Sequence, residues 1–362
     1  MNTDRTNEIL SHFILNGTPI AVTTLGSGLI NDTFKVSTVE KDCPDYVLQR
    51  INHAVFTDVA LLQHNIEAVT AHIRARLEAR GEKDIDRKVL HFVSTREGAT
   101  WHRTPEGDYW RVSVFIPRTQ SFDAVTPPNA YDAGSAFGGF ESMLADLDEP
   151  LGETIPDFHN MRLRLDQLRD AVARDAHGRL AGVRTLVDSL LAHAEDMCLA
   201  ERLHAAGLLP KRICHCDSKV GNVLFDEGGG VLCVIDLDTV MPSFVFSDYG
   251  DFLRTAANAT VEDDPDESHV ALRWDVIESF TRGYIESTRS FLTATERTHL
   301  PFAMALFPYM QCVRFLADYL NGDTYYKTTH PGHNLERAHN QFRLYQLAEA
   351  GMPRLSAFIS SL

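Results

Sequence analysis

Three side chains in the segment 213–225 have the types and spacing of a phosphoryl-transfer site. His215 and Asp217 are separated by one residue, and Asn222 follows in an H-x-D-x-x-x-x-N pattern. A carboxylate at the second position can accept the proton of an attacking hydroxyl, and an amide oxygen at the last can bind a hard cation. This spacing predicts Asp217 as the catalytic base, Asn222 as a metal ligand and His215 as support for the loop.

Two more carboxylates follow after a short hairpin. The apolar run at 231–235, entered from the glycine-rich turn 226–230, is typical of a strand and leads directly to Asp236. We predict that Asp236 binds Mg²⁺ and that Asp238, on the same face of an extended segment, binds a second metal or a water molecule. Zinc is not expected, because the two cysteines that flank His215 have no second Cys/His pair nearby.

The N-terminal part contains a candidate phosphate-covering turn. Apolar stretches at 21–25 and 33–39 predict strands on either side of it. Glycines let backbone N–H groups approach a polyphosphate, although ordinary hairpins show the same pattern. The nucleotide contacts predicted here are Gly26, Gly28, Asn31 and Thr33.

The strand predicted at 46–52 lacks the lysine that kinases use to hold the nucleotide phosphates. Gln49 and Arg50 are the candidates to replace it, and alternation places them on opposite faces of the strand. The helix predicted at 58–78 offers Glu67 as partner of such an anchor, with a solvent-exposed glutamate as the equal alternative.

The order of elements predicts an α+β fold with two lobes. We expect strands at 91–94 and 109–116, on either side of the turn 106–108, to complete an antiparallel N-terminal sheet. From 133 onward the apolar spacing is helical, with segments at 136–147, 161–173, 183–206, 270–287, 295–320 with a break at Pro308, and 334–350. Because 362 residues exceed the usual size of one core, we expect lobes at 1–117 and 118–362.

The sequence resembles the aminoglycoside phosphotransferase and choline kinase superfamily, and within it most closely the N-acetylhexosamine 1-kinases. The resemblance rests on Cys-His-Cys-Asp-Ser-Lys-Val-Gly-Asn-Val-Leu from 214, Val-Ile-Asp-Leu-Asp-Thr-Val-Met-Pro from 234, Asp-Tyr-Gly-Asp-Phe-Leu-Arg from 248 and Arg-Phe-Leu-Ala-Asp-Tyr-Leu-Asn-Gly-Asp-Thr-Tyr-Tyr from 314. It implies a bilobal kinase fold that uses ATP and Mg²⁺. It also implies that adenine meets backbone groups at the end of the sheet, in Phe115, Ile116 and Pro117.

Four residues of the C-terminal part have expected roles. The resemblance implies that Arg314 and Tyr325 contact a sugar, whereas the spacing alone equally allows an i, i+4 ion pair of Arg314 with Asp318. Asp251 and Arg254 are expected to hold the catalytic loop, because the segment before them is too short for the activation segment of a protein kinase.

Composition restricts the class of protein. A net charge of −16 without a local Lys/Arg cluster argues against nucleic acid, while a metal can still neutralise nucleotide phosphates locally. No apolar run reaches the roughly 18 to 20 residues of a membrane helix, no secretory signal is apparent, and the six scattered cysteines form no disulfide framework. We expect a cytoplasmic monomer or homodimer without a membrane partner.

These observations predict an ATP-dependent kinase of a small alcohol. The resemblance favours a hexose, phosphorylated at the anomeric hydroxyl of N-acetylglucosamine or N-acetylgalactosamine. Choline, homoserine or an aminoglycoside is an alternative acceptor. A nucleotide-binding regulator without activity is an alternative of another class, because the phosphate-anchoring lysine is missing.

Overall fold

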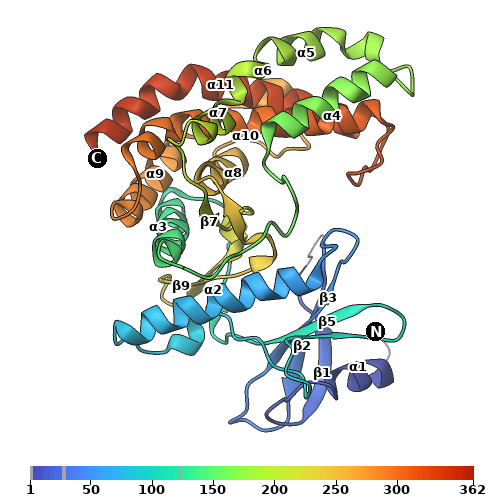
Figure 1. The fold of residues 1–362 in the computed structure, drawn as a ribbon, viewed down its shortest axis with the longest axis vertical. Helices are drawn as coiled ribbons and strands as arrows, with labels where there is room; N and C mark the ends of the chain where they lie inside the picture. The colour runs from blue at the N-terminus through green and yellow to red at the C-terminus, as the bar shows by residue number, and fades with distance from the viewer. Residues whose placement is uncertain (1–2, 27–29, 123) are drawn as a thin grey trace. The chain divides into compact units, whose positions relative to one another are not determined.

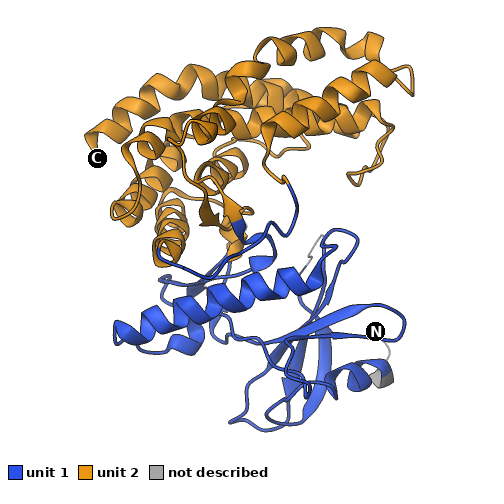
Figure 2. Ribbon diagram, in the orientation of Figure 1, with its two compact units in different colours: residues 1–121, 146–156, 223–241 blue, residues 122–145, 157–222, 242–362 orange. Residues whose placement is uncertain are grey.

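The computed structural model describes residues 3–26, 30–122 and 124–362. The chain forms two compact units that are not continuous in sequence (Figure 2). Unit 1 comprises Met1–Ser121, Asp146–Pro156 and Val223–Met241, and unit 2 comprises Phe122–Ala145, Asp157–Asn222 and Pro242–Leu362. The first boundary lies close to the predicted residue 117, but two later segments return to unit 1.

Unit 1 contains an antiparallel sheet with the strand order β1-β2-β3-β5-β4 (Figure 1). Its strands are β1 (Pro19–Thr24), β2 (Asp32–Thr38), β3 (Tyr46–Ile51), β4 (Trp101–Arg103) and β5 (Tyr109–Val114). Alternate side chains of β3 and β5, such as Leu48 and Val112, join Ile9 and Leu10 of helix α1 (Thr3–Leu10) in one core cluster. Polar side chains point from the other face of these strands, as period-two alternation requires.

Helix α2 (Val59–Ala79) begins where the Asp58 side chain accepts a hydrogen bond from the Leu61 N–H. A short 3₁₀ helix, η1 (Ile85–Arg87), follows it. The remaining elements of unit 1 are a sheet with the order β6-β8-β9 and a 3₁₀ helix, namely β6 (Thr119–Gln120), β8 (Val223–Asp226), β9 (Val231–Val234) and η3 (Leu237–Thr239). Between β8 and β9, the Asp226 carboxylate accepts the N–H groups of Gly228 and Gly230, which closes the predicted glycine-rich turn.

Unit 2 is mainly helical (Figure 1). Its helices are α3 (Pro127–Leu144), α4 (Met161–Arg174), α5 (Leu180–Ala192), α6 (Ala194–Met197), α7 (Leu199–Ala205), α8 (Phe246–Ala256), α9 (Trp274–Thr288), α10 (Ala294–Leu320) and α11 (His333–Ser361), with 3₁₀ helices η2 (Val220–Asn222) and η4 (Glu267–His269). A small sheet pairs β7 (Arg212–Cys214) with β10 (Met241–Ser243), most of which belongs to this unit.

Helices α3 and α9 cross closely because glycines remove side chains at their contact. A Cβ at Gly283 would lie 2.1 Å from the Tyr131 carbonyl oxygen, and one at Gly134 would lie 2.2 Å from that of Phe280. Helix α10 is long and apolar enough to cross a membrane, and 89% of its most apolar window is buried within the protein. The burial is that of a core helix in unit 2.

The predicted fold class is confirmed, with an antiparallel sheet in the N-terminal part and helices in the C-terminal part. Three local predictions were wrong. Residues 91–94 contribute only an isolated bridge at Phe92, because β4 is the strand that pairs with β5 across the turn. Residues 183–206 form three helices that break at His193 and Cys198. Helix α10 continues through Pro308, since packing on nearly every side outweighs one lost backbone hydrogen bond.

Candidate active site

The loop between β7 and η2 brings Asp217 and Asn222 together. The Asn222 amide nitrogen donates to the backbone oxygen of Asp217 at 2.8 Å and to its carboxylate at 3.2 Å. Lys219 forms an ion pair with the same carboxylate at 2.9 Å. Because its nitrogen is engaged by Asp217, Asn222 retains its amide oxygen for a cation, and that donor type suits Mg²⁺. The described residues therefore fit the metal role predicted for Asn222.

Asp217 is suited to accept a proton. Burial opposes its ionisation, but the charge of Lys219 and the hydrogen bonds from Lys219 and Asn222 outweigh this, so the pKa of Asp217 lies below its ordinary value. The side chain is 35% exposed, which leaves the carboxylate accessible. The group is therefore an accessible carboxylate at neutral pH.

His215 supports the loop, in the position that the sequence predicted. Its ring is fully buried and packs edge-on against Phe137 and Phe140 of α3. Its Nδ1 accepts a hydrogen bond from the Asp217 N–H at 3.3 Å. The imidazole thus connects the catalytic loop to a helix in the core of unit 2.

The residue with the most direct hydrogen bonds to the loop was not among the site residues predicted from the sequence. Asp248 of α8 accepts the backbone N–H of His215 at 2.8 Å and that of Cys216 at 2.7 Å, and its own carbonyl accepts the Ser218 hydroxyl at 2.5 Å. Asp248 is fully buried. The sequence signal that could have identified Asp248 was its place as the first residue of the Asp-Tyr-Gly-Asp block. It lies three residues before Asp251, which was predicted instead.

Asp251 and Arg254 form an ion pair within unit 2. Arg254 contacts Asp251 at 3.1 Å and Glu262 at 2.5 Å. Burial raises the pKa of Asp251 to about 6, with the charge of Arg254 opposing and that of Asp217 adding to the rise. The pair therefore lies within electrostatic reach of the Asp217 carboxylate, while the direct bonds described for the loop come from Asp248. Loop support by Asp251 and Arg254 stays a prediction.

The sequence predicted that the two aspartates after β9 lie on the same face of an extended segment. The structure shows that they do not. Asp236 has a left-handed backbone with φ of +61°, and Asp238 lies in η3. The turn separates the two carboxylates because a 3₁₀ helix rotates each residue by about 120°. Asp236 stays the predicted metal ligand. Asp238 is engaged inside unit 1, which gives its metal role no support.

Arg111 is a buried cation of unit 1, and it was not among the site residues predicted from the sequence. Its guanidinium pairs with Asp238 at 2.6 Å, and both side chains are at most 5% exposed. The other Asp238 carboxylate oxygen accepts the amide of Asn31 at 2.5 Å. The available signal was an arginine in the middle of an otherwise apolar strand, where a buried charge requires a partner.

Arg111 also organises the residues that were predicted to replace the missing lysine. Gln49, its cross-strand neighbour, accepts from Arg111 at 3.0 Å and donates to the Thr33 hydroxyl at 3.1 Å. Arg50 points the other way, forming an ion pair with Asp32, and its side chain is 46% exposed. Of the two candidates, Gln49 therefore lies on the side of the phosphate-covering turn.

Glu67 does not pair with a basic anchor among the described residues. It accepts a hydrogen bond from the Thr100 hydroxyl and is exposed at the surface of α2. The α2 side chain that reaches Arg111 is Gln63, at 3.1 Å. Gln63 lies one helical turn before Glu67. Glu67 is therefore the solvent-exposed glutamate that was predicted as the equal alternative.

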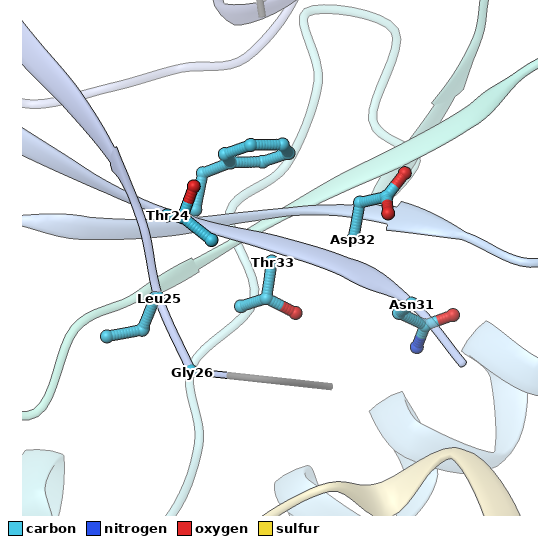
Figure 3. Close-up of a pocket in the computed structure, with 7 residues that line it drawn as sticks. Thr24, Leu25, Gly26, Asn31, Asp32 and Thr33 are labelled. Carbon is cyan, nitrogen blue, oxygen red and sulfur yellow. The ribbon is translucent and has the colours of Figure 1, made fainter. Parts of the chain in front are cut away.

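The described part of the phosphate-covering turn borders a hollow in unit 1. Gly26, Asn31 and Thr33 line it (Figure 3), together with Thr24, Leu25, Asp32 and Phe34. Gly26 has φ of +73°, a conformation that favours glycine, and open space lies where its Cβ would be. Gly28 lies outside the described residues. Three of the four predicted contacts therefore surround one hollow.

The backbone at the end of β5 has fewer free groups than the resemblance implied. The Phe115 N–H donates to the Asp45 carbonyl at 2.9 Å, and Pro117 has no N–H. The carbonyls of Ile116 and Pro117 accept from Thr119 and Arg87, at 3.3 and 3.2 Å respectively. Among these three residues, only the N–H of Ile116 is not used in these bonds, so it is the donor we expect adenine to meet.

Arg314 does not pair with Asp318, so the ion-pair alternative was wrong. The Asp318 carboxylate instead accepts the backbone N–H groups of residues 324–326 at 2.9 to 3.0 Å. Arg314 is hydrogen-bonded to Gln311 at 3.1 Å, and its guanidinium lies between 5.5 and 6.0 Å from the ring centres of Phe158, Tyr325 and Tyr326. Asp318 therefore shapes the loop that carries the tyrosines.

The aromatic surroundings of Arg314 contain a second positive charge, that of Arg164. Arg164, half-buried, donates to the carbonyls of Asp157 and Phe158, and burial followed by the charge of Arg314 lowers its pKa to about 10. Burial, followed by the charges of Arg314 and Arg164, holds the pKa of His159 well below its ordinary value. Among the described residues, Arg314 has no carboxylate within ion-pair distance.

Comparisons with known proteins give the family of the chain. Residues 21–278 match the model of the phosphotransferase enzyme family, which is more than half of the chain. The chain belongs to the phosphotransferase enzyme family. It is accordingly a phosphotransferase of the small-molecule kinase type.

Solved structures share the fold of this phosphotransferase at low sequence identity. An amicoumacin kinase in complex with AMP-PNP, Ca²⁺ and Ami is 13% identical, with a TM-score of 0.57 over 97% of this chain and 94% of the other. A choline/ethanolamine kinase family protein from Mesorhizobium loti is 17% identical, with a TM-score of 0.57 over 100% and 99% of the two chains. A spectinomycin phosphotransferase in complex with ADP and spectinomycin is 12% identical, with a TM-score of 0.55 over 96% and 99%.

Proposed function

We propose that this phosphotransferase transfers the γ-phosphoryl group of ATP to the anomeric hydroxyl of an N-acetylhexosamine. In this function Asp217 accepts the proton of the sugar hydroxyl, and Lys219 and Asn222 keep its carboxylate ionised beforehand. Asn222 and Asp236 are the residues that would hold Mg²⁺, which offsets the charge of the transferring phosphoryl group. Binding of AMP-PNP and Ca²⁺ by the amicoumacin kinase supports the use of ATP and a divalent metal.

The observation that carries the choice of acceptor is the position of Arg314. Rings that would form a cage for a quaternary ammonium group surround a guanidinium instead, and Arg164 adds a second positive charge. A cationic acceptor such as choline or an aminoglycoside would meet repulsion here. A sugar offers hydroxyl and acetamide oxygens that accept from arginine, and its apolar face stacks on tyrosine.

A panel of acceptors tests the proposal. N-acetylglucosamine, N-acetylgalactosamine, glucose, choline, homoserine and an aminoglycoside are each supplied with ATP and Mg²⁺, and ADP release is measured. We expect the highest kcat/KM with an N-acetylhexosamine, and loss of its reducing end because the anomeric hydroxyl is consumed. Faster turnover of choline or the aminoglycoside would overturn the proposed acceptor, and ATP binding without turnover of any acceptor would favour the regulator.

A further inference from the structure

A buried carboxyl group lies behind the catalytic loop and has no part in the chemistry proposed so far. Glu141 of α3 is 2% exposed, and its carboxyl lies in a group with the Asp248 carboxylate and the Cys214 thiol. Ligand atoms of these three side chains all lie within 4.8 Å of one another. The Tyr284 hydroxyl of α9 donates to one Glu141 oxygen at 2.5 Å.

The available hydrogen-bond donors show where a proton is needed. Asp248 receives two backbone N–H groups, from His215 and Cys216. The second oxygen of Glu141, Oε1, is buried and accepts no hydrogen bond from the described residues. Two carboxylates this close in a buried site cannot both be ionised. A proton on Glu141 removes the repulsion and supplies a donor at the orphaned oxygen.

The surroundings assign that proton to Glu141 rather than to its partner. Burial, followed by the negative charge of Asp248, raises the pKa of Glu141 well above its ordinary value. Burial also raises the pKa of Asp248, but His215 and the two backbone N–H groups oppose the rise. Burial keeps Cys214 a thiol by raising its pKa, so it adds at most a weak donor.

The charged groups on neighbouring helices and strands do not change the assignment of the proton to Glu141. Arg212 of β7 pairs with Glu296 of α10 at 2.9 Å, so its charge is compensated. Asp251 of α8 is paired with Arg254. Burial raises the pKa of Tyr284 on α9 well above its ordinary value, so this side chain is a neutral donor.

We propose that Glu141 is a positioning residue that remains protonated and donates its hydrogen bond to the Asp248 carboxylate. This bond fixes the two oxygens that hold the backbone of His215 and Cys216, and therefore the loop that carries Asp217. The effect on turnover rests on the proposed role of Asp217, whereas the protonation of Glu141 does not depend on it. Chemically, the cluster is a carboxylic acid bound to a carboxylate.

A metal ion is the competing explanation. Cysteine, glutamate and aspartate are residue types that bind zinc. Both Asp248 oxygens, however, already face N–H donors, and burial disfavours the thiolate that a metal would need at Cys214. The geometry therefore favours a proton over a cation.

Two variants of Glu141 separate a neutral acid from a charged group. Glu141→Gln keeps a donor for Asp248 and an acceptor for Tyr284, whereas Glu141→Met keeps the volume and provides neither. We expect Glu141→Met to lower kcat about tenfold, the effect of roughly 1.4 kcal/mol, with the KM for ATP within about twofold. Glu141→Gln should restore most of the lost kcat. Equal losses in both variants would show that Glu141 acts as a carboxylate and would overturn the proposal.

A measurement on the unaltered protein covers the case in which Glu141→Met fails to fold. The infrared band of a protonated carboxyl group is expected at neutral pH in the unaltered protein and absent from Glu141→Gln. Absence of the band from the unaltered protein would overturn the protonated state, whatever the kinase activity is. Elemental analysis of the purified proteins completes the test. One equivalent of bound metal in the unaltered protein that is lost in Glu141→Gln and in Cys214→Ser would show a metal site and overturn the protonated state of Glu141.

Discussion

At the scale of single residues, the site is a set of charges whose partners determine their state. Asp217 is kept ionised by Lys219 and Asn222, whereas Glu141 is kept neutral by burial and by Asp248. Two carboxyl groups within one unit thus have different protonation states because their surroundings differ. Residue type alone does not distinguish them.

Asp217→Asn tests the catalytic carboxylate. Removing the proton acceptor should lower turnover by roughly 10² to 10⁴, the usual effect of a positioned acid–base group, while ATP binding stays near normal. Steady-state kinetics with nucleotide titration measure both. Asp166→Asn, in an exposed pair on α4, is the matched control and should retain full turnover. More than about a tenth of normal turnover in Asp217→Asn would exclude it as the general base.

Arg314→Ala tests the acceptor side. Loss of a charged hydrogen-bond donor should raise the sugar KM by about tenfold or more, and leave the KM for ATP within about twofold. Because Asp318 is held by backbone N–H groups, the melting temperature should change little. Tyr325→Phe, which removes only a hydroxyl, should act in the same direction more weakly. A large fall in melting temperature with unchanged sugar kinetics would make Arg314 a structural residue.

At the scale of elements, packing places helices where their backbones can approach. The contact of α3 with α9 depends on glycines, and α3 carries both Glu141 and the phenylalanines against His215. Helix α3 therefore contacts both α9 and the loop that carries Asp217. Packing also outweighs the local backbone preference in helix α10, which continues through two prolines within the core.

Gly283→Ala and Gly139→Ala form a matched pair for this contact. A Cβ at Gly283 would lie 2.1 Å from the Tyr131 carbonyl oxygen, so we expect a destabilisation of about 1 to 3 kcal/mol, or more if the helices cannot shift. A Cβ at Gly139 on α3 meets nothing within 4 Å, and alanine there should stabilise by about 0.4 to 1 kcal/mol. Denaturant unfolding measures both. Equal effects would show that the contact tolerates a methyl group.

At the scale of the whole molecule, the two units are assembled from separated stretches of chain. Within unit 1, Asn65 of α2 donates to the carbonyls of Gly152 and Val240, and Arg111 of β5 pairs with Asp238. Both later segments therefore supply partners for buried polar groups of the first segment. A boundary at residue 117 alone would separate these partners.

Arg111→Met tests this assembly. Leaving the buried Asp238 carboxylate without its cation should destabilise the protein by about 3 to 5 kcal/mol. Arg50→Met removes an exposed pair of the same sheet and should cost less than about 1 kcal/mol. Chemical denaturation of both variants measures the difference. A loss below about 1 kcal/mol for Arg111→Met would mean that the ion pair does not hold the segments together.

The sequence by itself determined the fold class, most element positions and the grouping of Asp217 with Asn222 in one loop. These features follow from local spacing: apolar periodicity sets helices and strands, and the H-x-D-x-x-x-x-N pattern lies within one loop. Its local errors arose where packing outweighs propensity, as at Pro308 and His193.

Only the tertiary structure decided which distant side chains meet. It paired Arg111 with Asp238, turned Asp318 toward backbone N–H groups instead of Arg314, and placed Glu141 against Asp248. The physical reason is that burial forces each polar group to find a partner, and the partner is chosen by proximity in space rather than by spacing along the chain.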